Sequence, residues 1–327
     1  QLHTTMQKPY VLGLDMGGTN SVLGVVDARG HVLGRTSIKT QAYRDINDYV
    51  NALYEEAEKI IEPLGGMEMV RGIGAGVPNG NFYTGYIQEA MNLPWQTVPF
   101  AQLVSERFGL PCRITNDANA AAMGEMTYGA AKGMKNFIMI TLGTGVGSGI
   151  VINGEVVYGH DGFAGELGHT TAVRNNGRAC GCGKTGCLET GASGSAILRI
   201  FIEKLREGRA SLLSEKFNKG EEITLMDILN AVNEEDVLAI EVVEEIGTVL
   251  GRALAGLINL FNPELVVIGG IVANAREYLL LPVKSAIQKH SLNLVNKDTS
   301  IKFSKLGDKA GPIGACMLSR TKLLGLI

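Results

Sequence analysis

The feature that most constrains this chain is a strand, glycine turn, strand pattern that occurs twice along it. Residues 10–39 read YVLGLDMGGTNSVLGVVDARGHVLGRTSIK, with apolar runs at 10–14 and 22–26 on either side of Gly-Gly-Thr. Residues 140–159 read ITLGTGVGSGIVINGEVVYG and repeat the arrangement. Short apolar runs bounded by turn residues predict strands, and the glycines predict tight turns between them.

The two segments correspond position by position, about 126 residues apart. The matching pairs are Gly17 with Gly143, Val25 and Val26 with Val151 and Ile152, and, after a small gap, Gly30 with Gly154. Two unrelated hairpins in one α/β protein would also give this pattern, because glycine turns between strands are common. We favour a duplicated domain in which each half contributes a glycine turn to one shared cleft.

The rest of the chain alternates between helical and strand patterns, which is typical of an α/β fold. Apolar spacing and turn residues predict helices at about 46–61, 98–108, from 119 onward, 234–261, 275–290 and from 312, and strands at about 70–78, 112–116, 264–271 and 300–304. The length of 327 residues suits two domains.

Composition excludes several classes of function. Lys and Arg total 30 against 33 Asp and Glu, so the net charge of −3 gives no electrostatic case for a nucleic-acid partner. No apolar run is long enough to cross a membrane, and the first residues lack the apolar core of a signal peptide. We therefore expect a cytoplasmic protein with reduced thiols. Met6 is expected to be the native start.

Three glycine turns are candidate phosphate-binding sites. They are DMGGTN at 15–20, LGTGVGSG at 142–149 and IGGI at 268–271. Successive N–H groups in such turns bind anions, Thr144 adds a hydroxyl, and Asp15 offers a carboxylate to a phosphate-bound Mg²⁺. Each turn alone is equally an ordinary hairpin turn. None continues as a P-loop or as a dinucleotide-binding fingerprint, but together they favour a nucleotide.

A second candidate is TNDANAAAMGE, residues 115–125. Asn116 and Asp117 stand between a predicted strand and an alanine-rich helix. Asp117 or Asn119 as the cap of that helix is one interpretation. Asp117 as a general base that accepts a proton from a substrate hydroxyl is the other. The residues alone leave both open.

The third candidate is a cluster of thiols in RACGCGKTGCLE, residues 178–189. With the upstream GELGH they form the set His169, Cys180, Cys182 and Cys187. Three Cys and one His are the ligands of a closed structural zinc site. Such a site would hold Glu166 and Glu189 near each other, where carboxylates accept sugar hydroxyls, although both are equally readable as solvated surface charge. Cys112 and Cys316 are expected to be buried thiols.

Four of these motifs occur together, in the same order and at similar spacing, in a known family. DMGGTN, NDANAA, LGTGVGSGI with the later GFAGELGH, and CGCGKTGCLE resemble the ROK family of repressors and sugar kinases, and most closely its bacterial glucokinase-like members. The resemblance extends from about Val11 to Leu318. DMGGTN alone would indicate only the wider actin-like ATPase superfamily, whereas the last two motifs are specific.

The resemblance implies an actin-like, ribonuclease-H-type α/β fold of two duplicated domains with an interdomain cleft. The domains would be 8–116 plus about 311–327, and a larger 117–310 that carries the zinc loop. The implied activity is transfer of the γ-phosphate of ATP to a hexose, glucose at O6 being favoured.

The resemblance also implies roles for individual residues. Asp117 would be the catalytic base, and the sugar hydroxyls would bind Asn92, Asn116, Asp117, Glu166, His169 and Glu189. ATP and Mg²⁺ would bind Asp15, Gly17, Gly18, Thr19, Thr144 and Gly145, with Gly269 and Gly270 near the adenosine. Structural Zn²⁺ would bind His169, Cys180, Cys182 and Cys187, which makes the cysteine cluster a clamp on the sugar-binding loop.

One departure from the family pattern and several alternatives belong with this expectation. Pro78-Asn79 replaces the common Pro-Gly on the expected sugar side. The substrate could instead be N-acetylglucosamine, N-acetylmannosamine, mannose or fructose. A sugar-sensing ROK regulator is the other class. Because the first glycine-turn strand begins near residue 10, we expect no preceding DNA-binding domain, which disfavours the regulator. The family also implies a homo-oligomer, a dimer or a tetramer.

Overall fold

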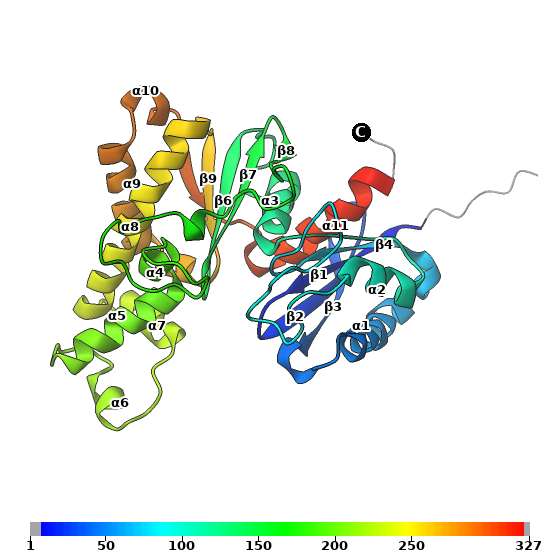
Figure 1. The fold of residues 1–327 in the computed structure, drawn as a ribbon, viewed down its shortest axis with the longest axis horizontal. Helices are drawn as coiled ribbons and strands as arrows, with labels where there is room; N and C mark the ends of the chain where they lie inside the picture. Colours follow the sequence, from blue (N-terminus) through cyan, green and yellow to red (C-terminus); the bar gives the residue numbers. More distant parts are fainter. Residues whose placement is uncertain (1–7, 324–327) are drawn as a thin grey trace, which may run out of the picture. The chain divides into compact units, whose positions relative to one another are not determined.

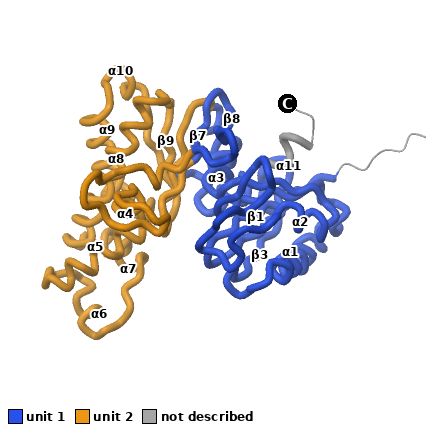
Figure 2. The backbone as a smooth tube through the Cα atoms, in the orientation of Figure 1, with its two compact units in different colours: residues 1–133, 149–164, 304–327 blue, residues 134–148, 165–303 orange. Residues whose placement is uncertain are grey.

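The computed structural model describes residues 8–323, which form two compact units (Figure 2). Unit 1 contains the chain up to Gly133, Gly149–Ala164 and the residues from Ser304 onward, and unit 2 contains Met134–Ser148 and Gly165–Phe303. The domain boundaries expected from the sequence stay a prediction. Met6 lies outside the described residues.

Each sheet has five strands, and the two share one topology (Figure 1). The first has the order β3-β2-β1-β4-β5, and the second, written from its other end, has the order β8-β7-β6-β9-β10. The strands are β1 Tyr10–Met16, β2 Asn20–Val26, β3 Val32–Lys39, β4 Val70–Gly76, β5 Cys112–Thr115, β6 Phe137–Leu142, β7 Val146–Ile152, β8 Glu155–Val156, β9 Leu265–Gly269 and β10 Ser300–Phe303.

The strand pairings repeat as well. β2 is antiparallel to β1 and to β3, while β4 and β5 continue the first sheet in parallel. In the second sheet β8 is antiparallel to β7, and β6, β9 and β10 are parallel. This shared topology confirms the internal repeat predicted from the two glycine-turn hairpins, because Gly17 and Gly143 each follow the first strand of their own sheet.

Helices cover both faces of the first sheet (Figure 1). The helical segments of unit 1 are η1 Thr40–Ala42, α1 Ile46–Ile61, η2 Glu62–Leu64, η3 Met67–Met69, α2 Phe100–Phe108, α3 Asp117–Tyr128, η6 Gly307–Lys309 and α11 Ala310–Leu323. Alternation along β1 sends Leu12 and Leu14 into one core with α1 and α2. The intervening Gly13 meets α11 on the other face, where a Cβ would collide with the carbonyl of Pro312.

Unit 2 has its own core, built between the second sheet and a group of long helices. Its helical segments are η4 Leu167–His169, α4 Glu189–Ala192, α5 Gly194–Arg206, α6 Ser214–Asn218, α7 Leu225–Asn233, α8 Val237–Phe261, η5 Ile271–Ala275, α9 Glu277–His290 and α10 Asn293–Asn296. The buried face of α8, which includes Ile246, Leu250 and Leu254, lies inside this core, whereas Val237 at the start of the helix is exposed.

Most predicted elements are present, with small shifts at their ends. The helix expected over 234–261 begins at Val237, because Glu235 has a left-handed φ of 63° and Asp236 caps the helix through Ala239 N. The helix expected over 275–290 begins at Glu277. Cys316 is buried as expected, whereas Cys112 is only half-buried.

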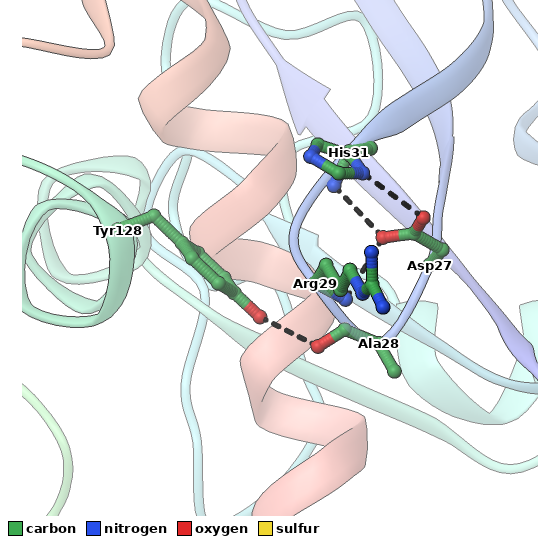
Figure 3. A network of polar contacts seen from close by, with 5 residues as sticks. All are labelled: Asp27, Ala28, Arg29, His31 and Tyr128. Carbon is green, nitrogen blue, oxygen red and sulfur yellow. Dashed lines mark hydrogen bonds and ion pairs between the residues drawn. The ribbon is translucent and has the colours of Figure 1, made fainter.

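The turn that joins β2 to β3 shows how local polar groups fix such connections (Figure 3). Asp27 Oδ1 accepts hydrogen bonds from the N–H groups of Arg29 and His31, both at 2.9 Å. Tyr128, at the end of α3, donates its hydroxyl to the carbonyl of Ala28 at 3.1 Å. The turn is therefore tied to α3. Across residues 8–323, no helix combines the length and the apolarity that a membrane crossing requires.

Candidate functional site

The first glycine turn closes the hairpin between β1 and β2 in unit 1. Gly17 N donates to the carbonyl of Asn20 at 2.8 Å, which leaves Gly18 and Thr19 at the tip. Thr40 supports the turn from outside, since its hydroxyl donates to Gly17 O at 2.8 Å and its N–H to Thr19 O at 2.9 Å. A turn with such fixed backbone can present its remaining N–H groups to an anion.

Asp15 lies on β1, just before this turn, and is half-buried. Burial, together with the negative charge of Asp117, raises its pKa from 3.8 to about 7, while the positive charge of Arg35 opposes the shift. The carboxylates of Asp15 and Asp117 therefore share one region of unit 1. A carboxyl whose ionisation is disfavoured by a neighbouring carboxylate is suited to a cation.

Asp117 is the first residue of α3, and its neighbour Asn116 is the cap. The Asn116 side chain accepts from Asn119 N at 2.7 Å, so the interpretation that Asp117 or Asn119 caps the helix is wrong. Asp117 Oδ1 accepts a hydrogen bond from the adjacent Ala118 N at 3.0 Å. The residue stays exposed to solvent, yet the protein around the carboxyl desolvates it and raises its pKa. An accessible carboxyl with a raised pKa suits a general base.

Asn92 lies on an exposed loop beside the first glycine turn. A Cβ placed on Gly18 would come within 3.0 Å of Asn92 Nδ2, so the turn and this side chain are in close contact. Unit 1 thus holds Asp15, Gly17, Gly18, Thr19, Asn92, Asn116 and Asp117, the first group of predicted site residues.

The second glycine turn joins β6 to β7 and is held by the start of two helices in unit 2. Gly194 N, at the start of α5, donates to Gly143 O at 2.8 Å. Glu189, the first residue of α4, accepts from Val146 N at 2.9 Å through Oε1. A side chain on Gly145 would overlap that oxygen. Thr144 is exposed at the tip. The structure therefore joins the predicted phosphate residues Thr144 and Gly145 to Glu189.

The loop that carries Glu166 and His169 is fixed to β7 by a buried serine. Ser148 donates its hydroxyl to Gly165 O and accepts from Leu167 N at 3.2 Å. These bonds hold Gly165 and Leu167, the residues on each side of Glu166. The backbone that carries the exposed Glu166 side chain is therefore fixed. Sequence reasoning missed Ser148, since a serine in a glycine-rich turn carries no signal of its own.

The four metal-ligand candidates come together as the sequence predicted. The donor atoms of His169, Cys180, Cys182 and Cys187 all lie within 4.8 Å of one another. Cys182 Sγ and Cys187 Sγ are 3.6 Å apart, and Cys180 Sγ is 3.7 Å from His169 Nδ1. A tetrahedral zinc with Zn–S bonds of about 2.3 Å separates its sulfurs by about 3.8 Å. The cluster therefore fits one tetrahedral ion, with Nδ1 as the histidine ligand.

The third glycine turn follows β9. Gly269 is buried at the end of the strand, and Gly270 has a left-handed φ of 89°. A Cβ on Gly270 would also overlap the carbonyl of Leu142, at the end of β6. Glycine is therefore required here by packing and by backbone conformation, whether or not a nucleotide binds.

The fold and these sites define an α/β protein with two matching sheets, three glycine turns and a Cys₃His cluster. A model of the ROK family matches residues 11–322, so the chain belongs to the ROK family. The fold is accordingly the actin-like α/β fold of the ROK sugar kinases.

Individual relatives agree with this assignment. A glucokinase of Halalkalibacterium halodurans is 38% identical over 94% of this chain and 94% of its own length. The structure of a ROK family glucokinase from Streptomyces griseus in complex with glucose and AMPPNP has a TM-score of 0.81 at 32% identity, over 95% of this chain and 99% of that one. The structure of a ROK family transcriptional regulator, a homologue of the Escherichia coli Mlc protein, has a TM-score of 0.84 at 29% identity. The match covers 95% of this chain and 78% of the regulator.

Proposed function

We propose that this protein is a glucokinase, which transfers the γ-phosphate of ATP to the 6-hydroxyl of glucose. The observation that carries the proposal is the similarity to glucokinases over nearly the full length of both chains, at 38% identity for the Halalkalibacterium halodurans protein. The Streptomyces griseus relative is described with glucose and AMPPNP bound.

In the proposed mechanism Asp117 accepts the proton of the attacking hydroxyl. Its raised pKa supports this role, because a base is most effective when its pKa approaches the working pH. Asn92, Asn116, Glu166, His169 and Glu189 would hold the other hydroxyls. Glu189 already accepts from Val146 N through Oε1, so Oε2 is the oxygen we assign to the sugar.

The two glycine turns would bind the phosphates. Gly18, Thr19, Thr144 and Gly145 would supply backbone N–H groups and hydroxyls, and Gly17, whose own N–H donates to Asn20 O, would hold the first turn in shape. Gly269 with Gly270 would border the adenosine. Asp15 would hold Mg²⁺, which when bound neutralises charge on the phosphoryl oxygens. The charge of Asp117 disfavours the ionisation of Asp15, which supports a cation at this position.

The Cys₃His cluster would hold structural zinc, which would fix the fold of the loop. His169 contacts Cys180 through Nδ1, so Nδ1 is the nitrogen we assign to the metal and Nε2 the one that faces the sugar. Metal ligation of one ring nitrogen fixes the tautomer of the other. We also propose that the protein acts in the cytoplasm as a homo-oligomer, a dimer or a tetramer, with no nucleic-acid or membrane partner.

The proposal is tested by ADP release with Mg-ATP over a panel of glucose, mannose, fructose, N-acetylglucosamine and N-acetylmannosamine. Glucose is expected to have the highest kcat/KM, and Asp117→Asn serves as the blank. Preference for another sugar would support a sugar kinase but assign it a different substrate.

A sugar-sensing regulator is the second candidate, favoured by the similarity to the ROK regulator. Sugar binding without turnover of any sugar in the panel would support it and contradict the kinase.

A further inference from the structure

The first glycine turn is supported by one short segment of unit 1, η1. Thr40 begins this segment and makes two hydrogen bonds to the turn, to Gly17 O and to Thr19 O. Thr40 itself is fixed by a buried chain of hydroxyls, since Tyr49 donates to Ser21 at 2.6 Å and Ser21 lies 2.8 Å from Thr40 Oγ1. The segment therefore has a rigid base in the core.

Gln41, the next residue of η1, contacts two different parts of the proposed site. Its Nε2 donates to Gly18 O at 2.6 Å and to Asn92 O at 2.8 Å. Both partners are backbone carbonyls, which only accept, so the amide nitrogen must be the bridging atom. Its two N–H groups are thus both used, one on the glycine turn and one on the loop that carries Asn92.

The glycine turn and the loop that carries Asn92 also contact each other directly, without Gln41. A Cβ on Gly18 would lie 3.0 Å from Asn92 Nδ2. The tip of the glycine turn and the Asn92 side chain are therefore neighbours, and a shift of one of them moves the surroundings of the other.

We propose that Gln41 is a positioning residue that couples the phosphate-binding turn to the sugar-binding loop. The inference deepens the proposed function and rests on it. The Gln41 amide holds the carbonyls of Gly18 and Asn92 together. The loop therefore keeps Asn92 at a fixed distance from the glycine turn, as simultaneous binding of sugar and phosphate would require. Without it, the Asn92 loop loses a tether and the sugar is bound more weakly.

The chain offers a reporter that does not depend on catalysis. Trp95 is the single tryptophan and lies three residues after Asn92. Its Nε1 donates to Tyr43 O at 3.0 Å, two residues after Gln41, and its ring is 4.8 Å from that of Tyr49. Its fluorescence therefore reports on both the loop and η1.

The test is Gln41→Met, which keeps the length of the side chain, adds no charge near the phosphates and removes both donors. Gln288→Met, an exposed position on α9 in unit 2, is the matched control. Glucose affinity is measured by Trp95 fluorescence, KM and kcat for glucose and ATP by ADP release, and Tm by thermal unfolding.

We expect Gln41→Met to weaken glucose binding about 10-fold, equivalent to 1.4 kcal/mol, with a matching rise in glucose KM and a Tm close to that of the parent. The control should leave all values unchanged. Unchanged glucose affinity and KM in Gln41→Met, with or without a lower Tm, would overturn the proposal while the kinase stands. A parent protein that phosphorylates no sugar would remove the proposed function and the coupling together.

Discussion

Glu189 Oε1 accepts a hydrogen bond from Val146 N at 2.9 Å, and the same oxygen leaves no room for a side chain on the preceding residue of the turn, Gly145. The carboxylate that the resemblance assigns to sugar binding thus also shapes the turn assigned to phosphate binding. Both belong to unit 2. With the proposed roles, one residue would therefore serve two substrates, and its disturbance should affect both.

Gly145→Ala should displace the Glu189 carboxylate and break its bond to Val146. We expect KM to rise at least about 10-fold for both glucose and ATP, since an added methyl cannot be accommodated without moving the acceptor. Steady-state kinetics with each substrate varied in turn measures this. Gly256→Ala on α8, where an added Cβ meets nothing within 4 Å, is the control. Normal KM for ATP would mean that the carboxylate does not shape the turn.

Asp117→Asn should lower kcat by about 100-fold or more, the scale of general-base catalysis, while glucose affinity stays within about threefold. In the parent protein, kcat should fall as the pH decreases through the raised pKa of Asp117, because the base must be ionised. A pH profile of kcat together with Trp95 fluorescence titration checks both. Equal losses of rate and affinity would show that Asp117 binds the sugar rather than removing its proton.

Asp15 should make stability depend on pH. Its pKa is about 7 in the folded state against 3.8 for an ordinary aspartate, so the folded state keeps a proton that the unfolded state loses between these values. The contribution of Asp15 to the free energy of unfolding is therefore most favourable below about pH 4. It decreases from about pH 4 to 7 and is constant above about pH 7.

Asp15→Asn removes this dependence and should stabilise the metal-free protein at pH 8. The expected gain is on the order of 2–4 kcal/mol, since one pKa unit corresponds to about 1.36 kcal/mol. Urea unfolding of both proteins from pH 4.5 to 8 measures the difference. In Asp117→Asn the midpoint should move to lower pH, because the charge of Asp117 contributes to the shift. A constant difference between the two proteins across this range would exclude the raised pKa.

Cys180→Ser should lose zinc and glucose affinity together. Removing one thiolate from a four-ligand site opens the cluster, and the loop that carries Glu166 and His169 loses its clamp. Metal analysis gives the zinc content, and fluorescence titration gives the affinity. Cys112→Ser, a cysteine outside the cluster, should keep both. Metal-free protein with a normal glucose KM would contradict the role of the clamp.

The sequence alone determined the features that depend on residue type and local spacing. Helical and strand periodicity predicted most elements, because the burial of one face imposes that period. The Cys₃His set followed from chemistry, since few arrangements of three thiols and an imidazole serve another purpose in a reducing compartment. The paired glycine turns predicted the repeat that the two sheets share. The family motifs added the assignment of roles.

Only the tertiary structure decided relationships between residues that are distant in the chain. The pKa of Asp15 depends on Asp117, which β4 and β5 bring to the same unit from about 100 positions away. The bridge from Gln41 to Gly18 and Asn92 carries no local pattern, because a glutamine in a loop is ordinary until its partners are known. Chain folding brings these distant residues close to one another. Their hydrogen bonds and the desolvation of their carboxyl groups exist only in the folded chain, so no local sequence pattern predicts them.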